Sequence, residues 1–277
     1  MRLIHFRVRF ILLLLTAFVA MMGCGQDVAP LRVLSYNIHY GIGMDGRMDL
    51  ARIAKVINDS GADLVGLQEV TDEAMVAQLE KLTGMQGIFG PSMKRDKMPN
   101  LYGLLGLEEP EDLLYYGDAV LSKYPFRYVG NIWIPSASDS RYQAMAIDLL
   151  VDGFSDSLRM ITTHFDYLQI LGSEISRRAA VEVIEQHFFT DYKGLAILTG
   201  DLNATPKAKS LQLLQDKGWL LYDGGKAQPT VPVANPTKQI DYVMPRPANE
   251  WEVLDVEVLD EPVASDHLPL LMTLYLR

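Results

Sequence analysis

From about residue 30 to its end, the chain alternates short apolar runs with amphipathic stretches and polar turns. Short apolar runs between turn residues predict strands, whereas apolar positions three and four residues apart predict helices. The predicted helices cover residues 49–61, 72–84, 176–189 and 210–219, and the predicted strands cover residues 31–38, 63–70, 118–125, 143–151, 157–165, 194–201, 239–245, 251–259 and 267–276. Strands dominate and helices lie between them, which predicts an α/β (α+β) four-layer sandwich of two mainly antiparallel sheets flanked by helices.

The stretch TGDLNATPKAKSLQLLQDKGW, residues 199–219, joins one of these strands to a helix. Pro206 suits the first helical turn, and the leucines after it have helical spacing. Asp201 and Asn203 therefore lie where the carboxyl end of a strand opens toward a helix, a favoured place for active sites in open α/β proteins. An ordinary turn, with Asn203 or Thr205 as the helix N-cap, explains these residues equally well.

The longest segment without a predicted element runs from residue 90 to residue 117. Loops of this length are usually functional or disordered. The segment carries Lys94, Arg95 and Lys97, then an apolar stretch, and then four acidic residues between 108 and 112. We interpret it as a surface flap near the functional site.

The first 24 residues have the organisation of a signal peptide. Three arginines precede a short apolar run over residues 10–20, which is too short and too unevenly flanked to predict a membrane span. Cys24, the only cysteine, directly follows Gly23, and this resembles a bacterial lipoprotein processing site, although Met21 stands where leucine is usual. Ordinary cleavage or a retained anchor is the alternative. A single cysteine also allows no disulfide within the chain.

The composition suits one large domain, which we place at residues 30–277. The chain has 277 residues, of which 49% are hydrophobic. Its formal net charge is −10, but residues 1–23 hold three arginines and no acid, so the remainder has 22 basic and 35 acidic residues, or −13. An acidic protein repels polyanions at long range, which argues against a general nucleic-acid binder. Many soluble proteins are simply acidic, so charge alone does not exclude that class.

Polar residues recur at or near the ends of the predicted strands. They are Asn37, Glu69, His164, Asp201, Asn203, Asp241, Asp266 and His267. Some have an ordinary structural explanation: Glu69 could cap a nearby helix, His164 could be a hydrogen-bonded core histidine, and Asp241 could be an acid in an edge strand. Their repetition at successive strand ends instead predicts a single polar site.

Seven motifs within about residues 32–274 carry a family resemblance. They are SYNIHYG, GLQEV, AVLSKYP, THFD, GDLNATP, QIDYV and SDHLPL. In residue type, order and context they resemble the endonuclease/exonuclease/phosphatase superfamily, which includes pancreatic-type DNases, abasic-site endonucleases, neutral sphingomyelinases and inositol polyphosphate phosphatases. GDLN followed by SDH is the most specific pair. The stretch SYNIHYGIGMDGRMDLARIAKVI is similar to exported bacterial members of the superfamily, whose substrates are often unassigned.

The resemblance implies a divalent metal ion, with Mg²⁺ expected and Mn²⁺ as the alternative. Such hard cations prefer oxygen ligands and keep several waters. Glu69 is the expected main ligand, supported by Asn37, and Asp266 is expected in or near the same set of ligands.

The resemblance also implies roles for the remaining strand-end residues. Asp201 would orient or deprotonate the attacking water, and Asn203 would hold the phosphate or that water. His267 beside Asp241 would form a carboxylate–imidazole pair that favours the imidazolium, which can donate to the phosphate. His164 would donate a second hydrogen bond to the developing charge.

Two further positions bear on the substrate. Arg141 matches the region where family members often place a phosphate-contacting basic residue, with a surface arginine as the alternative. His39 stands two residues after Asn37, where abasic-site endonucleases usually carry an acid. It could touch the metal or substrate, although a supporting or exposed histidine is favoured.

These features predict a Mg²⁺-dependent phosphoric ester hydrolase that is exported, either as a membrane-anchored lipoprotein or in periplasmic or extracellular form. Its substrate is a phosphodiester or phosphomonoester, with a small phosphoester or lipid head group preferred over nucleic acid. A secreted endonuclease or exonuclease is the alternative, and a non-catalytic binding protein with the same fold is a third. The expected partners are the phosphoester and a membrane reached through lipidated Cys24. The chain is expected to be a monomer without an obligate protein partner.

Overall fold

The computed structural model of the chain describes residues 29–94, 115–137, 141–151, 153–154, 156–170, 172–222 and 228–277. The predicted signal peptide, Cys24 and the centre of the predicted flap, residues 95–114, lie outside these ranges. No helix in the described ranges has the length and apolar character needed to cross a membrane.

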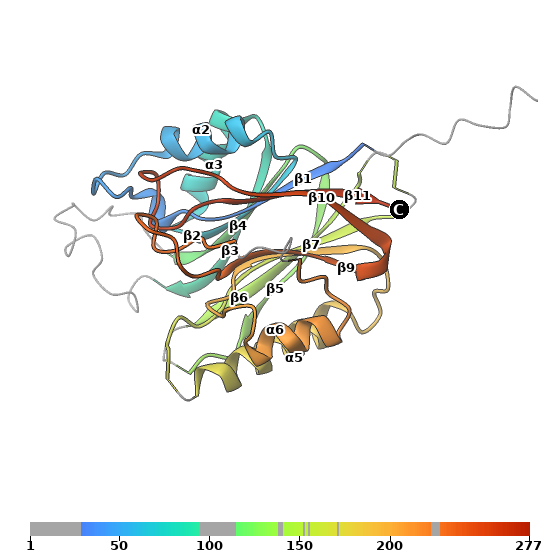
Figure 1. The fold of residues 1–277 in the computed structure, drawn as a ribbon. Coiled ribbons are helices and arrows are strands. Elements are labelled where there is room, and N and C mark those ends of the chain that lie inside the picture. Colours follow the sequence, from blue (N-terminus) through green and yellow to red (C-terminus); the bar gives the residue numbers. More distant parts are fainter. Residues whose placement is uncertain are drawn as a thin grey trace, which may run out of the picture.

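Two mixed sheets pack face to face, and α-helices cover their outer sides (Figure 1). The first sheet has the strand order β10-β11-β1-β2-β4-β3 and the second has the order β5-β6-β7-β8-β9. Only β1 with β2 and β7 with β8 are parallel among the pairs of named strands. The first sheet consists of β1 (Leu31–Asn37), β2 (Leu64–Val70), β3 (Gln86–Lys94), β4 (Tyr115–Ser122), β10 (Trp251–Val258) and β11 (Leu270–Leu276). The second consists of β5 (Phe126–Ile134), β6 (Tyr142–Leu149), β7 (Leu158–His164), β8 (Ala196–Asp201) and β9 (Asp241–Arg246).

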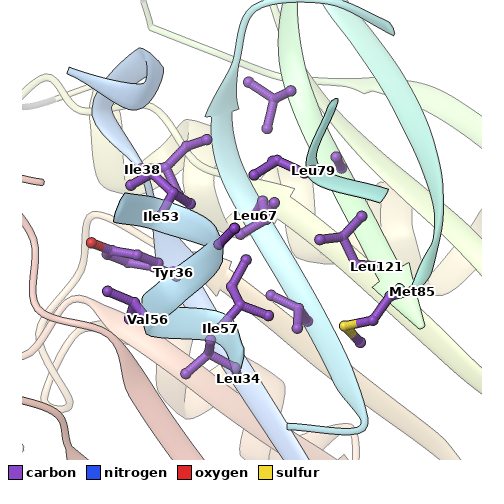
Figure 2. Close-up of a cluster of buried hydrophobic side chains, with 14 of the residues drawn as sticks. Leu34, Tyr36, Ile38, Ile53, Val56, Ile57, Leu67, Leu79, Met85 and Leu121 are labelled. Atoms are coloured by element: carbon purple, nitrogen blue, oxygen red, sulfur yellow. The ribbon is translucent and has the colours of Figure 1, made fainter. Parts of the chain in front are cut away.

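The helices α2 (Leu50–Ser60) and α3 (Glu73–Thr83) cover the first sheet, and α5 (Ser173–Phe188) and α6 (Lys209–Asp216) cover the second. Figure 2 shows Ile53 and Ile57 of α2 beside Leu67 of β2, in the apolar layer between these helices and the first sheet. A second apolar layer lies between the two sheets, and a third lies under α5 and α6. The predicted four-layer sandwich is therefore confirmed.

Four details of the predicted organisation were wrong. The first two are β3 and β5, which were not predicted. The third is the predicted flap at residues 90–117, whose two ends are strand: residues 90–94 belong to β3 and residues 115–117 to β4. The fourth is the helix after Asp201, which begins at Lys209 with Ala208 as its N-cap, so Pro206 precedes the helix and neither Asn203 nor Thr205 caps it.

The two sheets approach each other closely at Gly66 of β2. A Cβ atom at this position would lie 1.9 Å from Oγ1 of Thr199 in β8, so only glycine allows this spacing. Glu69 follows Gly66 by three residues, and Asp201 follows Thr199 by two. The close approach therefore brings these two carboxylates together at one end of the sandwich.

Gly66→Ala is expected to lower the free energy of unfolding by about 1–3 kcal/mol, because the added methyl group overpacks the layer between the sheets. Urea denaturation measures this change. Gly130→Ala is the matched control, since its Cβ would meet Cε1 of Phe188 at an ordinary 3.5 Å. Equal stability of the two variants would contradict the proposed close contact.

Candidate active site

Strand register aligns three of the predicted site residues across the second sheet. His164 ends β7 and lies opposite Asp201 at the end of the parallel strand β8. Asp201 in turn lies opposite Asp241 at the start of the antiparallel strand β9. Because the carboxyl ends of parallel strands meet at one edge, the side chains of all three residues are buried at the same end of the sheet.

Asn37 joins this group to the first sheet. Its Nδ2 donates to Oε1 of Glu69 at 3.1 Å and to Oδ2 of Asp201 at 3.2 Å. Its Oδ1 accepts from the backbone N–H of His39 at 3.0 Å. In this conformation Asn37 holds the two carboxylates together through its amide nitrogen, and its role as a metal ligand stays a prediction.

Glu69 lies at an irregular point in β2. The register between β2 and β4 shifts between Leu67 and Val70, and Glu69 has a left-handed φ of 60°. Bulges and left-handed non-glycine residues often aim side chains at functional sites. The alternative role of Glu69 as a helix cap is wrong, because Asp72 caps α3 by accepting from the backbone N–H of Met75 at 2.8 Å.

The pKa of Glu69 is raised, first by burial and also by the negative charge of Asp266, while the positive charge of His164 would lower it. Asp266 is half-buried beside Ser265. Oγ of Ser265 donates to the backbone carbonyl of Asn37 at 2.7 Å, which ties this loop to the end of β1. The negative charge of Asp266, in the loop before β11, therefore adds to the cost of ionising Glu69 near the end of β2.

The predicted carboxylate–imidazole pair is present. Nδ1 of His267 lies 2.9 Å from Oδ2 of Asp241, and Oγ1 of Thr230 donates to the same carboxylate oxygen. Burial would lower the pKa of His267, but the charge and hydrogen bond of Asp241 and the charges of Asp201 and Asp266 raise it well above its usual value. Asp241 does lie in an edge strand, yet it is fully buried and paired with His267.

His164 has partners at both ring nitrogens. Nδ1 lies 3.0 Å from Oη of Tyr116, and Nε2 lies 3.0 Å from Nδ2 of Asn203. Asn203 has a left-handed φ of 48°, and its Nδ2 also donates to the carbonyl of Phe165 at 3.0 Å. His164 is thus a buried, hydrogen-bonded histidine whose neighbour is a site residue, and its predicted donation to a phosphate stays a prediction.

The side chains of two further predicted residues, Arg141 and His39, make their described contacts away from the strand-end group. The exposed Arg141 stacks on Trp133, with Cζ 4.1 Å from the ring centroid. Within the described residues we find no hydrogen bond or ion pair that joins Arg141 to the strand-end group. The ring of His39 is held by its own turn, since Nδ1 lies 3.0 Å from the carbonyl of Ile42.

Several residues of the site were not predicted from the sequence. Tyr116 supports His164, and Thr230 supports Asp241. Asp118 is also buried nearby, where it accepts from Nε2 of Gln143 at 2.6 Å; burial raises its pKa well above the usual value. Their partners are distant in sequence, so local pattern gives no signal for these roles.

The oxygen donors at this end of the sandwich fit a hard divalent cation. Ionised Glu69 and Asp266 repel each other, and a cation bound to both would remove that repulsion. Asp201, Asp241 and His267 also place one ligand-type atom each within 4.8 Å of one another. A protonated imidazole cannot coordinate a metal, however, and the pKa of His267 is raised. The expected metal ligands Glu69 and Asp266 stay a prediction.

The fold is shared with several solved structures. An endonuclease/exonuclease/phosphatase from Beutenbergia cavernae is 22% identical with a TM-score of 0.70, over 89% of this chain and 72% of that one. The human Nocturnin catalytic domain with bound sulfate is 21% identical with a TM-score of 0.64, over 90% and 94%. A mannosyl-6-phosphatase from Bacteroides thetaiotaomicron is 18% identical with a TM-score of 0.65, over 88% and 99%. None of the curated proteins matches the chain.

Two packed sheets with carboxylate, amide and imidazole groups at one end are typical of a class of proteins that contains phosphoesterases and nucleases. The chain belongs to the endonuclease/exonuclease/phosphatase family, which it matches over residues 34–267. Members of this family are hydrolases of phosphoesters and are typically metal-dependent. The predicted family membership is therefore confirmed.

Proposed function

We propose that this protein is a Mg²⁺-dependent phosphoesterase that prefers small phosphoesters or lipid head groups. The observation that carries the proposal is the meeting of Asn37, Glu69, Asp201, Asn203 and His267 at one end of the sandwich. These residues come from loops and strands of both sheets. A purely structural role would not require so many buried polar groups from distant parts of the chain to meet.

Glu69 and Asp266 would hold the cation, with Asn37 keeping Glu69 in place. When bound, a divalent cation neutralises charge on the phosphate oxygens. Mg²⁺ is preferred because the available donors are oxygens, and Mn²⁺ accepts similar ligands.

Asp201 is the proposed base for the attacking water. Its carboxylate is oriented by the N–H groups of Asn37 at 3.2 Å and of Asn203 at 2.9 Å. The water gives its proton to Asp201, its oxygen bonds to phosphorus, and the ester oxygen leaves with the electron pair of its bond. Such positioned proton transfer contributes typically about 10²- to 10⁴-fold to rate.

His267 is the proposed cationic donor to the phosphate. Asp241 fixes its orientation and favours the imidazolium. Nε2 of His267 lies 3.7 Å from Oδ2 of Asp201, so the donor and the base face the same region. Asn203 would add an amide donor to the phosphate or the attacking water.

The preference for small substrates rests on charge. The chain without its first 23 residues has a net charge of −13, which disfavours polyanions at long range. The mannosyl-6-phosphatase among the similar structures is in line with a small phosphoester. A panel of sugar phosphates, nucleotides, phosphoinositides, sphingomyelin and DNA, each with Mg²⁺ and with EDTA, tests the proposal. Turnover of DNA alone would favour the nuclease alternative, and no metal-dependent turnover of any substrate would defeat the proposal.

Glu69→Ala is expected to weaken Mn²⁺ binding by more than about 100-fold. A residue that only supports a ligand typically changes affinity by about 10- to 100-fold, and a direct ligand should exceed this. Isothermal titration calorimetry on the purified protein measures the affinity. Glu73→Ala is the matched control, because Glu73 is an exposed acid in the first turn of α3. If folded Glu69→Ala binds Mn²⁺ with the affinity of the parent, Glu69 is not a metal ligand.

A further inference from the structure

Arg177 is buried, and among the described residues its guanidinium donates hydrogen bonds to main-chain carbonyls around the Asn203 turn. Its Nη1 donates to the carbonyls of Asp166 at 3.3 Å, Leu168 at 3.4 Å and Asn203 at 3.2 Å. Its Nη2 donates to the carbonyl of Leu168 at 3.2 Å. The side chain is only about 5% exposed. One guanidinium therefore joins the loop after β7 to the turn after β8.

The loop after β7 directly follows His164, and the turn after β8 carries Asn203. Asn203 has a left-handed backbone, which is uncommon for residues other than glycine and needs support from its surroundings. On the site side, Nδ2 of Asn203 donates to the carbonyl of Phe165 and lies against Nε2 of His164. On the opposite side, Arg177 holds the carbonyl of the same Asn203. Asn203 is thus held on two sides, at its side-chain amide and at its backbone carbonyl.

Glu174 extends this connection to the next helix. Its Oε2 lies 3.6 Å from Nε of Arg177, and its Oε1 accepts from the backbone N–H of Ser210 in α6. The guanidinium is planar and offers five donors in a fixed fork, which a lysine ammonium cannot reproduce. These contacts therefore depend on the planar shape and the number of donors of arginine as well as on its charge.

We propose that Arg177 is a positioning residue for the phosphoester reaction, which it serves by fixing Asn203 and, through it, His164. This inference rests on the proposed function of the site. A displacement of about 1 Å at a reacting group can cost roughly 10²-fold in rate. The neighbouring Arg178 is exposed on the same helix and is the matched control.

The kinetic test compares Arg177→Met, Arg177→Lys and Arg178→Met on bis-p-nitrophenyl phosphate. Arg177→Met is expected to lower kcat by about 10- to 100-fold with Mn²⁺ affinity unchanged, and Arg178→Met is expected to match the parent. Arg177→Lys should fall between them and serves as the test variant if Arg177→Met does not fold. In the Asn203→Ala background, Arg177→Met should cause little further loss, because the residue it positions is gone. A parental kcat in folded Arg177 variants, or fully additive losses, would overturn the proposal.

A second readout does not depend on catalysis. The side-chain amide signals of Asn203 can be identified in a ¹H–¹⁵N spectrum by their loss in Asn203→Ala. They are expected to shift in the folded Arg177 variants and to stay in place in Arg178→Met. If the parent hydrolyses no substrate, the proposed function fails, and these signals alone decide whether Arg177 positions Asn203. Unchanged signals in the folded Arg177 variants would overturn the inference.

Discussion

Asp201→Asn is expected to lower kcat by about 10²- to 10⁴-fold, the typical contribution of a positioned general base. Asparagine keeps the size of the side chain and an oxygen that can accept from the backbone N–H of Asn203, but it cannot take a proton from water. The loss should therefore fall on kcat, with a smaller change in KM. Steady-state hydrolysis of bis-p-nitrophenyl phosphate at saturating Mg²⁺ measures both.

The matched control is Asp216→Asn at the end of α6, where an exposed acid is lost without contact to the site. This variant should keep the parental rate. Circular dichroism should show that Asp201→Asn is folded. If folded Asp201→Asn keeps kcat within a few-fold of the parent, Asp201 is not the base.

Asp241→Asn is expected to lower kcat by about 10²-fold or more and to change the pH profile. The anionic partner of His267 is lost, while the shape of the side chain is kept. In the parent, the charge and hydrogen bond of Asp241 help raise the pKa of His267. The proposed role of His267 as a cationic donor requires its protonated form, so the rate should fall as pH rises through that pKa. With Asp241 neutralised the pKa of His267 is lower, and the alkaline limb moves to lower pH.

The pH–rate profile of Asp241→Asn beside the parent measures this shift. Asp255→Asn in β10 removes an exposed carboxylate and is the control for net charge. Both variants remove one negative charge, but only Asp241 is paired with His267. An alkaline limb at the parental pH in folded Asp241→Asn would show that Asp241 does not set the protonation of His267.

Hydrophobic pattern predicted the strands and helices that have regular spacing, and it missed two edge strands. β3 contains Gly87, Gly90 and Pro91, which break a strand pattern, yet edge strands tolerate such residues because one side needs no partner. β5 has a register shift between Tyr128 and Gly130, which interrupts its alternation. Both strands depend on pairing with a neighbour, which local sequence does not encode.

The candidate site was predictable where its residues follow an apolar run. Asn37, Asp201 and His164 end strands, and strand ends meet at one edge of a sheet. The residues that support them have no such signal. Arg177 and Arg178 are adjacent on one helix, and only the packing of α5 decides that the first is buried and the second exposed. Arg141, matched by region alone, stacks on Trp133, and its contact with a phosphate stays a prediction.

Residue order also leaves the orientation of the Asn37 amide open. Asn37 was expected to support the metal, and that role stays a prediction; in the structure its amide nitrogen faces Glu69 and Asp201. Residue type and order indicate that an amide lies at the site. The orientation of that amide is favoured by the backbone N–H of His39, which donates to the side-chain carbonyl oxygen of Asn37. Such an orientation follows from the local turn after β1, which residue order does not specify.

The most direct test of the account is hydrolysis of bis-p-nitrophenyl phosphate by the purified protein after EDTA treatment and during titration with Mg²⁺. We expect no turnover with EDTA, saturable recovery as Mg²⁺ is added, and no comparable recovery in folded Asp201→Asn. Turnover that persists in EDTA, or that is equal in the parent and in Asp201→Asn, would contradict a metal-dependent phosphoesterase centred on these strand-end residues.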